Sequence, residues 1–301
     1  GAEFEADLCG VAAGERADGP AGRLPRLDFV VPDRSDLPPL ERYARLRLPN
    51  GARRVAGYTE ASRGCLHLCR HCPVVPVYGG HLRIVSADVV LEDVARQVDA
   101  GAVHVTFGDP DFLNGPRHAL TIVERLAQRF GGLTYDVTIK VEHLLKHAAL
   151  LPRLRDTGCL FVTSAIESFD DRVLARLAKG HTGAEAERAI ALCEEAGVPL
   201  APTFVAFTPW VTLEGYGRFL QAIAGLGLIE RVPSIQLALR LLIPAGSRLL
   251  DLPEMRAMVG PFDAQRLVHP WPHPEPVMDG LQADVERFVA SRAGAPRREI
   301  F

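Results

Sequence analysis

Residues 62–73 read SRGCLHLCRHCP and contain three of the six cysteines in this 301-residue chain. The spacing is Cys65-x3-Cys69-x2-Cys72, and the loop directly follows an apolar run at 54–60 that we predict to be a strand. Thiolates at such intervals in a loop can converge on a single cube of iron and sulfide. Three ligands leave one iron of a 4Fe–4S cluster open, and an open iron can accept a chelating cosubstrate. The stretch therefore predicts an iron–sulfur site with a free coordination position.

The alternative is a structural zinc site that uses the same cysteines with His67 or His71 as the fourth ligand. A closed zinc site normally combines two separated pairs of ligands, and the sequence offers no second pair. The remaining cysteines are isolated. Cys159 opens an apolar run and Cys193 lies in a helical pattern, so we expect both in the core, whereas Cys9 has no assigned role.

Beyond the loop, short apolar runs alternate with amphipathic stretches, which is typical of repeated βα units. Strands are predicted at 54–60, 103–107, 134–140, 159–165, 200–207 and 235–243. Helices are predicted at 86–100, 116–130, 144–156, 170–178, 184–196 and 213–226, with Ser86 as an N-cap and Pro116 in a first turn. Helices between successive strands imply a parallel sheet. The pattern is compatible with a partly open (β/α)6 barrel and with a doubly wound sheet.

Composition favours one catalytic domain, because 48% of the residues are hydrophobic and 24% are charged. We expect an irregular leader at 1–52, a core at 53–260 and a short C-terminal extension at 261–301, with a helix near 280–290. The net charge of -3 and the scattered arginines favour a small-molecule partner over nucleic acid or a membrane. No apolar run approaches the roughly 20 residues that span a bilayer, and the first residues do not form a signal peptide. We therefore expect a cytoplasmic protein.

The cysteine loop, on the first strand of a six-fold βα pattern, resembles the signature of the radical S-adenosylmethionine (SAM) superfamily. The resemblance implies an α/β fold of the partial TIM-type (β/α)6 kind. It also implies a 4Fe–4S cluster held by the three cysteines and SAM bound to the open iron through its amino and carboxylate groups. A reductant such as flavodoxin or ferredoxin is implied as a partner. The position before the third cysteine is usually aromatic and close to adenine; here it is His71.

Polar residues just past the strands are candidates for the SAM pocket, because sites in βα barrels gather at the C-terminal ends of the strands. Asp109 matches the acidic member of a GGE-like motif that holds the SAM amino group, and Asp111 lies in the same loop. An ordinary Asp-Pro turn is the alternative at Asp109. Lys140 could meet the SAM carboxylate with Glu142 beside it, and a surface ion pair is the alternative there.

Later strand ends add further candidates. Ser164 and Glu167 follow the fourth strand, where the superfamily often places contacts to the ribose and the carboxylate. His181 is another candidate. Arg240, inside an apolar run, needs a partner or a ligand. It suits a carboxylate through two parallel hydrogen bonds, and a structural salt bridge is the alternative.

Five phrases together resemble a narrower group, the radical SAM proteins named for a CUAEP or CCAEP tail. They are CRHCPVVPVYGG, TFGDPDFLNGP, DVTIKVEHLLKH, CLFVTSAIES and RLLIPAGSRLL. The similarity runs from about residue 58 to 289, and the sequence ends at RREIF without the thiol-rich tail. The group is also similar to the radical SAM enzyme of arsinothricin formation. That similarity implies transfer of the 3-amino-3-carboxypropyl group of SAM to trivalent arsenic, a metalloid that soft thiol ligands would bind. Hydrogen abstraction by a 5′-deoxyadenosyl radical and a non-catalytic metal-binding module stay open.

Overall fold

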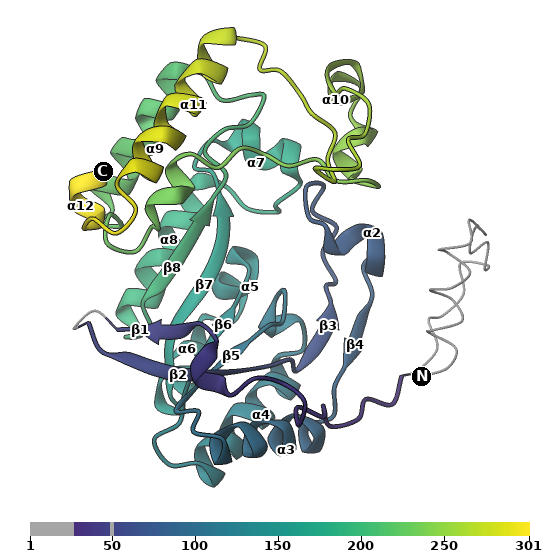
Figure 1. The fold of residues 1–301 in the computed structure, drawn as a ribbon, viewed down its shortest axis with the longest axis vertical. Helices are drawn as coiled ribbons and strands as arrows, with labels where there is room; N and C mark the ends of the chain where they lie inside the picture. Colours follow the sequence, from purple (N-terminus) through teal and green to yellow (C-terminus); the bar gives the residue numbers. More distant parts are fainter. Residues whose placement is uncertain (1–26, 49–50) are drawn as a thin grey trace.

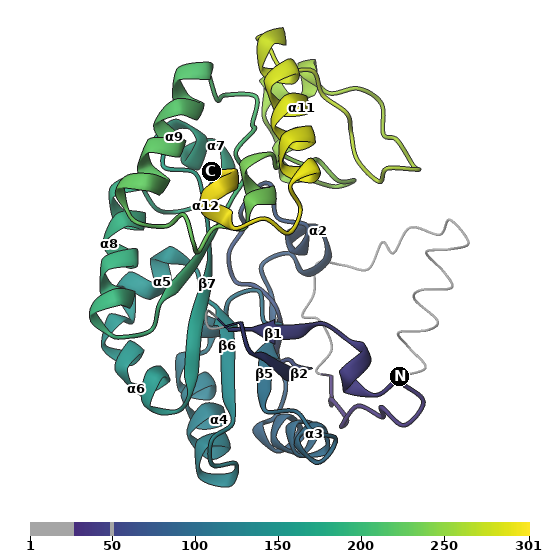
Figure 2. The same ribbon diagram turned by 60° about the vertical axis from the view of Figure 1, so that its left-hand side comes forward.

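The computed structural model describes residues 27–48 and 51–301, and its centre is a curled sheet with helices on its outer face (Figures 1 and 2). The order in the sheet is β1-β2-β5-β6-β7-β8, where β1 is antiparallel to β2 and the others are parallel. These strands are Arg45–Arg47, Arg53–Thr59, His104–Phe107, Thr134–Thr138, Cys159–Glu167 and Leu200–Phe204. The predicted α/β partial barrel is confirmed, and β1 adds a strand within the expected leader.

Most of the helices predicted between the strands are present, and several begin at a residue whose side chain caps them, whereas three short helices, at 74–78, 253–258 and 297–300, are not predicted by the sequence. The longer ones are α3 (Ala87–Asp99), α4 (Pro116–Arg129), α8 (Gly183–Glu195), α9 (Leu213–Gly225) and α11 (Pro276–Ser291). The short ones are α2 (Val74–Tyr78), α5 (Val141–Lys146), α6 (Leu151–Asp156), α7 (Asp171–Leu177), α10 (Pro253–Met258) and α12 (Arg297–Ile300). Ser86 caps α3 by accepting from the backbone N–H of Val89, and Thr182 with Glu185 forms a capping box on α8. Among the described residues, no helix is long and apolar enough to cross a membrane.

The main hydrophobic core lies between the sheet and these helices. Val105, Val137 and Val162 point from three neighbouring strands into it and are fully buried. Burial of each such side chain is worth about 1.5–3 kcal/mol. Cys159 and Cys193 are buried here as predicted.

Two predicted elements are wrong in detail. The helix predicted at 144–156 is interrupted: α5 ends at Lys146, a 3₁₀ turn spans Ala148–Leu150, and α6 begins with Pro152 in its first turn. Proline has no N–H to donate to the preceding turn, so it begins a helix more readily than it continues one.

The strand predicted at 235–243 is reduced to a 3₁₀ helix, Ser234–Leu237, followed by a single parallel bridge between Phe207 and Arg240. The side chain of Gln236 lies where a neighbouring strand would pair with β8. Its Oε1 accepts the backbone N–H of Phe204 at 2.8 Å, so a side-chain amide takes the place of a sixth strand beside β8. The apolar run thus packs without extended pairing.

An antiparallel hairpin, β3 (Ser62–Gly64) with β4 (Leu82–Ile84), was not indicated by the sequence. It stands with α2 on the opposite side of the molecule from α8 and α9 (Figures 1 and 2). The cysteine stretch connects β3 to α2. The hairpin therefore carries the three cysteines from the end of β2 toward the carboxyl ends of the parallel strands.

Candidate functional site

The cysteine loop is fixed in place by hydrogen bonds to segments far away in the sequence. The backbone N–H of Arg70 donates to the carbonyl of Leu177 at 2.9 Å. The Arg70 guanidinium donates to the carbonyls of Ala175 and Arg176 at 3.1 and 3.0 Å. The Ser247 hydroxyl donates to the Arg70 carbonyl at 3.1 Å. The loop is thus joined to the end of α7 and to the segment after the barrel, and no local sequence pattern predicts these contacts.

The three thiols of the loop are free, with Cys69 buried and Cys65 and Cys72 half-buried. Burial raises the pKa of the Cys65 and Cys72 thiols, and the neighbouring cysteines add to the effect. The Asn114 amide opposes it at Cys65, where Nδ2 donates to Sγ at 3.5 Å. Three free thiols close enough to raise one another's pKa on one loop are a donor set that fits an iron–sulfur cluster, because iron would replace their protons and bind the thiolates.

Next to the loop lies a buried charged group formed by His71, Glu167 and Lys179. His71 Nε2 is 3.0 Å from Glu167 Oε1, and Lys179 Nζ is 3.5 Å from the same oxygen. Burial opposes ionisation of Glu167, but these two partners prevail and lower its pKa. Glu167 also has a φ of 69°, in the left-handed region that a side chain of this size rarely adopts. The structure brings two predicted site residues together here and adds Lys179, which the sequence analysis missed.

A second polar group gathers His67, Asp111, Lys140, Glu142 and His143. Lys140 Nζ is 3.1 Å from His67 Nδ1 and donates to Glu142 Oε2 at 3.0 Å. Asp111 Oδ2 is 2.6 Å from His143 Nδ1 and 3.4 Å from His67 Nε2. Burial opposes ionisation of Asp111, but contacts with the two histidines prevail and lower its pKa to about 2. His143 was missed, although it directly follows Glu142 past the third parallel strand.

The two polar groups are neighbours through the segment 179–181. A Cβ on Gly180 would lie 3.0 Å from Glu142 Oε2 and 3.3 Å from Lys140 Nζ, and the φ of Gly180 is 75°. Glycine therefore allows the backbone between Lys179 and His181 to approach the Lys140–Glu142 pair closely. His181 is 7% exposed, and burial followed by the charge of Lys179 lowers its pKa to about 4. The ring is neutral at pH 7.

Three other predicted residues lie away from these groups: Asp109 and Arg240 have partners elsewhere, and the buried Ser164 hydroxyl has none among the described residues. Both oxygens of Asp109 bind the start of the hairpin: Oδ2 accepts from the Ala61 N–H at 2.8 Å and Oδ1 from the Ser62 hydroxyl at 2.5 Å. Burial raises the pKa of Asp109 to about 6 against those bonds. The arrangement makes Asp109 a positioning residue for β3, since it ties the end of β5 to the hairpin.

Ser164 shares a face of β7 with Val162 and Ile166, and all three are fully buried. Because successive side chains alternate across a strand, Ser164 points toward the helix layer and not toward the inner face of the barrel. Arg240 forms a structural salt bridge, which was the alternative to a ligand contact. Its guanidinium contacts Asp279 at 2.6 Å, donates to the Trp271 carbonyl and lies 3.6 Å from the centre of the Trp271 ring. Neither residue is available to the polar groups described above.

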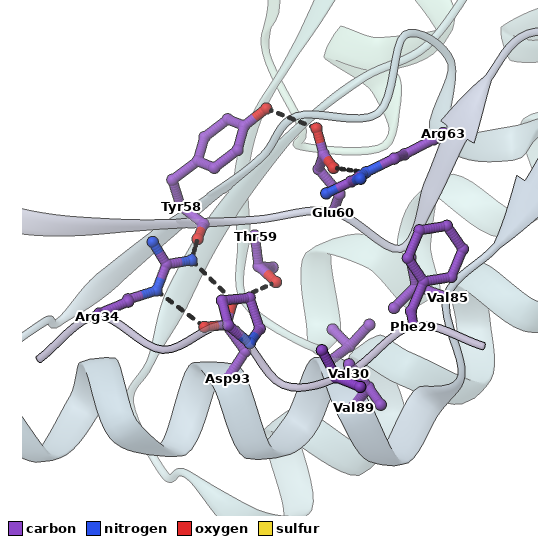
Figure 3. Close-up of a pocket in the computed structure, with 12 residues that line it drawn as sticks. Phe29, Val30, Arg34, Tyr58, Thr59, Glu60, Arg63, Val85, Val89 and Asp93 are labelled. Carbon is purple, nitrogen blue, oxygen red and sulfur yellow. Dashed lines mark hydrogen bonds and ion pairs between the residues drawn. The ribbon is translucent and has the colours of Figure 1, made fainter. Parts of the chain in front are cut away.

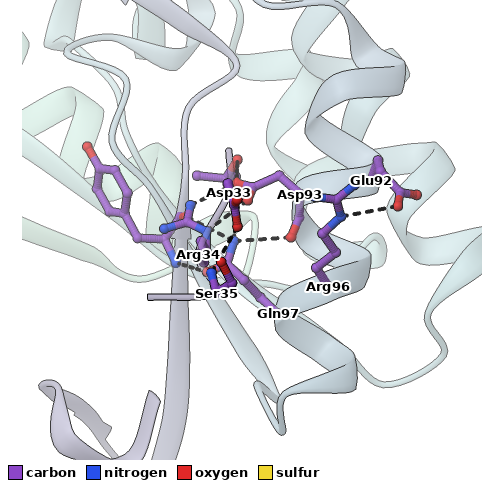
Figure 4. A network of polar contacts seen from close by, with 9 residues as sticks. Asp33, Arg34, Ser35, Glu92, Asp93, Arg96 and Gln97 are labelled. Atoms are coloured by element: carbon purple, nitrogen blue, oxygen red, sulfur yellow. Dashed lines mark hydrogen bonds and ion pairs between the residues drawn. The ribbon is translucent and has the colours of Figure 1, made fainter. Parts of the chain in front are cut away.

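A cavity of about 280 Å³ lies beside the end of β2, between α3 and the segment around Phe29 and Val30 (Figure 3). Its floor is the ion pair of Arg34 with Asp93, where Nε is 2.9 Å from Oδ1. Gln97 extends this network by accepting the Tyr58 N–H and donating to the Tyr58 carbonyl (Figure 4). None of the three loop cysteines lines the cavity, so we assign it to attachment of residues 29–36 and not to the reaction.

Comparison with curated proteins finds relatives of low identity. A protein of Methanocaldococcus jannaschii named as a methylthiotransferase is 25% identical over 53% of this chain and 37% of its own length. The hopanoid C-2 methylase of Rhodopseudomonas palustris is 22% identical over 51% of this chain and 30% of its own length. The hopanoid C-3 methylase of Methylococcus capsulatus is 23% identical over 50% and 29%. The chain spans about a third of the length of these relatives.

Solved structures support the fold. The cobalamin-dependent SAM radical enzyme OxsB, with aqua-cobalamin bound, has a TM-score of 0.65 at 16% identity over 79% of this chain and 41% of that chain. The radical SAM methyltransferase TsrM of Kitasatospora setae, with cobalamin and a [4Fe-4S] cluster bound, has a TM-score of 0.50 at 20% identity over 58% and 33%. At these identities the similarity concerns the fold alone.

The family model described as the radical SAM superfamily matches residues 59–213, just over half of the chain. The match begins at the last residue of β2 and includes the cysteine loop and both polar groups. Members of this superfamily use a 4Fe–4S cluster and SAM, which are the two cofactors that the sequence predicts. The chain belongs to the radical SAM superfamily.

Proposed function

We propose that Cys65, Cys69 and Cys72 bind three irons of the 4Fe–4S cluster, leave the fourth for SAM, and make this chain an enzyme that cleaves SAM reductively to act on a small molecule. One observation carries the proposal: three free thiols lie on a loop anchored beside the carboxyl ends of the parallel strands. When bound, the cluster supplies one electron that breaks a carbon–sulfur bond of SAM. A protein such as flavodoxin or ferredoxin would deliver that electron.

The buried charges beside the loop are proposed to bind the polar parts of SAM. Glu167 would accept from the amino group, and Lys179 and Lys140 would pair with the carboxylate. These three residues are only 4–8% exposed to solvent. Low exposure strengthens such contacts, since water screens them less. His71 is hydrogen-bonded to Glu167 and fixes the orientation of that carboxylate.

The finer proposal is transfer of the 3-amino-3-carboxypropyl group of SAM to trivalent arsenic. It is supported by the resemblance of five phrases to the CUAEP/CCAEP-tail group, which is itself similar to the arsinothricin-forming enzyme. The competing reaction is hydrogen abstraction from an organic substrate by the 5′-deoxyadenosyl radical. The two reactions break different carbon–sulfur bonds of SAM, so they leave different nucleosides.

The nucleoside product separates them. The cluster is reconstituted anaerobically, and the enzyme is incubated with SAM, dithionite and arsenite. Aminocarboxypropyl transfer yields 5′-methylthioadenosine and a new carbon–arsenic species by mass spectrometry. Formation of 5′-deoxyadenosine alone would contradict this finer proposal and leave reductive cleavage intact.

A non-catalytic iron–sulfur or zinc-binding module is the competing class of function. About four irons and four sulfides per chain, lost in Cys69→Ala but kept in Cys193→Ala, would exclude zinc in the loop. Cys193 is a matched control because it is buried in the core on α8. An iron-loaded chain that releases no nucleoside from SAM under reducing conditions would favour the module.

A further inference from the structure

The second polar group contains three metal-ligand atoms that converge from separate parts of the fold. One atom each of His67, Asp111 and His143 lies within 4.8 Å of the other two. His67 belongs to the cysteine loop, Asp111 precedes the 3₁₀ turn Phe112–Asn114 after β5, and His143 is on α5 (Figure 1). Such convergence of buried side chains needs an explanation, because each must leave water.

Asp111 is held so that one of its oxygens stays available. Its Oδ1 accepts from the backbone N–H groups of Leu113 at 3.3 Å and Lys140 at 3.4 Å. Its Oδ2 faces the two histidine nitrogens, and the side chain is 1% exposed. The backbone amides therefore orient the carboxylate, while Oδ2 is left for another partner.

The contacts among the three atoms are close, but they are not hydrogen bonds. His143 Nδ1 is 2.6 Å from Asp111 Oδ2, yet both atoms, with His67 Nε2, are buried without a hydrogen-bond partner among the described residues. A ring N–H aimed at the oxygen would have satisfied both. A cation held between the three atoms would give each of them a partner, which the ring N–H groups do not do in this geometry.

We propose that His67 Nε2, Asp111 Oδ2 and His143 Nδ1 bind a zinc ion that is separate from the iron–sulfur cluster. Two imidazoles and one carboxylate are a ligand set for divalent first-row metals, and three protein ligands leave a position for water or substrate. The class of ligand that the open position would take is an oxygen-donor group of the substrate, such as a carboxylate.

Neighbouring charges suit a dication. Lys140 Nζ lies 3.1 Å from His67 Nδ1 and Glu142 Oε2 lies 3.7 Å from it. Binding of zinc through Nε2 would require the ammonium to turn from the ring toward Glu142, to which it already donates, so that the Nδ1–H could donate to Glu142. Lys140 is paired with Glu142 and does not cancel the charge of Asp111. With both histidines neutral, the group carries a net negative charge that zinc would reverse.

Metal analysis of the anaerobically reconstituted full chain tests the site. We expect about one zinc per chain in addition to the iron. Asp111→Asn keeps an acceptor for Leu113 and Lys140 but removes the charged ligand, and it should weaken zinc affinity by at least about 100-fold, measured against a competing chelator. His147→Asn is the matched control, because this ring lies 5.7 Å from that of His143 but outside the triad, and it should keep the zinc. Equal zinc affinity in Asp111→Asn would overturn the site.

The cluster and the zinc can be lost independently, which separates this inference from the proposed function. Cys69→Ala should lose iron and keep zinc, whereas Asp111→Asn should do the reverse. X-ray absorption at the zinc edge of the unaltered chain needs no variant to fold. We expect nitrogen and oxygen at about 2.0–2.1 Å. Sulfur at about 2.3 Å would place zinc on the cysteines and contradict the site, as would absence of zinc at saturating concentration.

Discussion

At the scale of single residues, the site contains two carboxylates whose surroundings shift their pKa values in opposite directions. Asp109 and Asp111 are two positions apart and both buried, yet burial raises the pKa of Asp109 to about 6 whereas two histidines lower that of Asp111 to about 2. Asp109 accepts from a backbone N–H and a hydroxyl, and those compensate less for lost water than the contacts of Asp111 with two imidazole rings do. The loop after β5 thus holds a positioning acid and an anion side by side.

The raised pKa of Asp109 predicts a pH dependence of stability. Its folded value of about 6 lies above the ordinary 3.8, so its contribution is fully present below pH 4 and is lost as the pH rises through 6. We expect the free energy of unfolding of the wild type, relative to Asp109→Asn, to fall by about 2 kcal/mol between pH 4 and pH 7. Urea unfolding of the cluster-free full chain at both pH values measures this. A difference that does not change with pH would contradict the assignment.

Glu167 predicts a loss of SAM affinity. If its carboxylate accepts from the amino group of SAM, Glu167→Gln replaces a charge-assisted hydrogen bond by a neutral one and should raise the SAM Kd by about 10-fold. Equilibrium binding to the cluster-loaded protein measures the change. Glu214→Gln is the control, because the Glu214 side chain is 85% exposed on α9. An unchanged Kd in both variants would exclude Glu167 from the SAM pocket.

At the scale of elements, the hydrogen bonds that place the cysteine loop come from neighbours that no local pattern shows. Helices and strands with clear periodicity were predicted to within a few residues, as α3 and β7 illustrate. The false sixth strand and the unpredicted hairpin depend on contacts between distant residues, such as Gln236 with Phe204. The position of the cysteines could be predicted because their spacing and the strand before them are local features of the sequence. The partners of Asp109 and Arg240 are distant in the sequence and could not be predicted in this way.

Arg70 predicts a local effect on the cluster. Arg70→Met keeps much of the side-chain bulk and the backbone bond to Leu177 but removes the two bonds to α7, which are worth about 1 kcal/mol each. We expect iron release to a chelator to accelerate by about 10-fold with little change in Tm. Arg188→Met, on the exposed face of α8, should release iron at the wild-type rate. Equal rates in the two variants would refute the anchoring role.

The hydrogen bond of Gln236 at the edge of the sheet should contribute to the free energy of unfolding. Gln236→Leu leaves the buried N–H of Phe204 without an acceptor and should lower the free energy of unfolding by about 1–3 kcal/mol. Gln282→Leu removes an amide that donates to the Ala238 carbonyl at a less buried position and should cost less than about 1 kcal/mol. Urea unfolding compares the two, and a larger loss in Gln282→Leu would contradict this account of β8.

At the scale of the whole molecule, the segments that precede and follow the barrel in the sequence are each attached to it by an ion pair. Residues 29–36 are held by Arg34 and Asp93, and α11 is held by Arg240 through Asp279. The division into a leader at 1–52, a core at 53–260 and an extension at 261–301 stays our proposal. Both attachments are ion pairs with one well-buried or ring-stacked partner, so each is more than a surface contact.

Arg34 predicts how the leader is attached. Arg34→Leu leaves Asp93, which is 2% exposed, with Thr59 and Gln97 as its side-chain partners within the described part of the chain (Figures 3 and 4). We expect amide hydrogen exchange in residues 29–36 to accelerate by at least about 10-fold while exchange in β6 and β7 is unchanged. Arg42→Leu, in the exposed turn Leu40–Arg42, is the control. Uniform acceleration across the chain would show general destabilisation and not release of this segment.

The bond from Ser247 to Arg70 also has a consequence in time. The two residues are 177 positions apart, so the ribosome adds all of that chain before the bond can form. At about 5–20 residues per second, this takes roughly 9–35 s. During that interval the cysteines have emerged but their loop lacks its last support. Iron loaded after chain release would therefore bind a cysteine loop that has all its hydrogen bonds, whereas iron loaded earlier would bind a loop without the bond from Ser247.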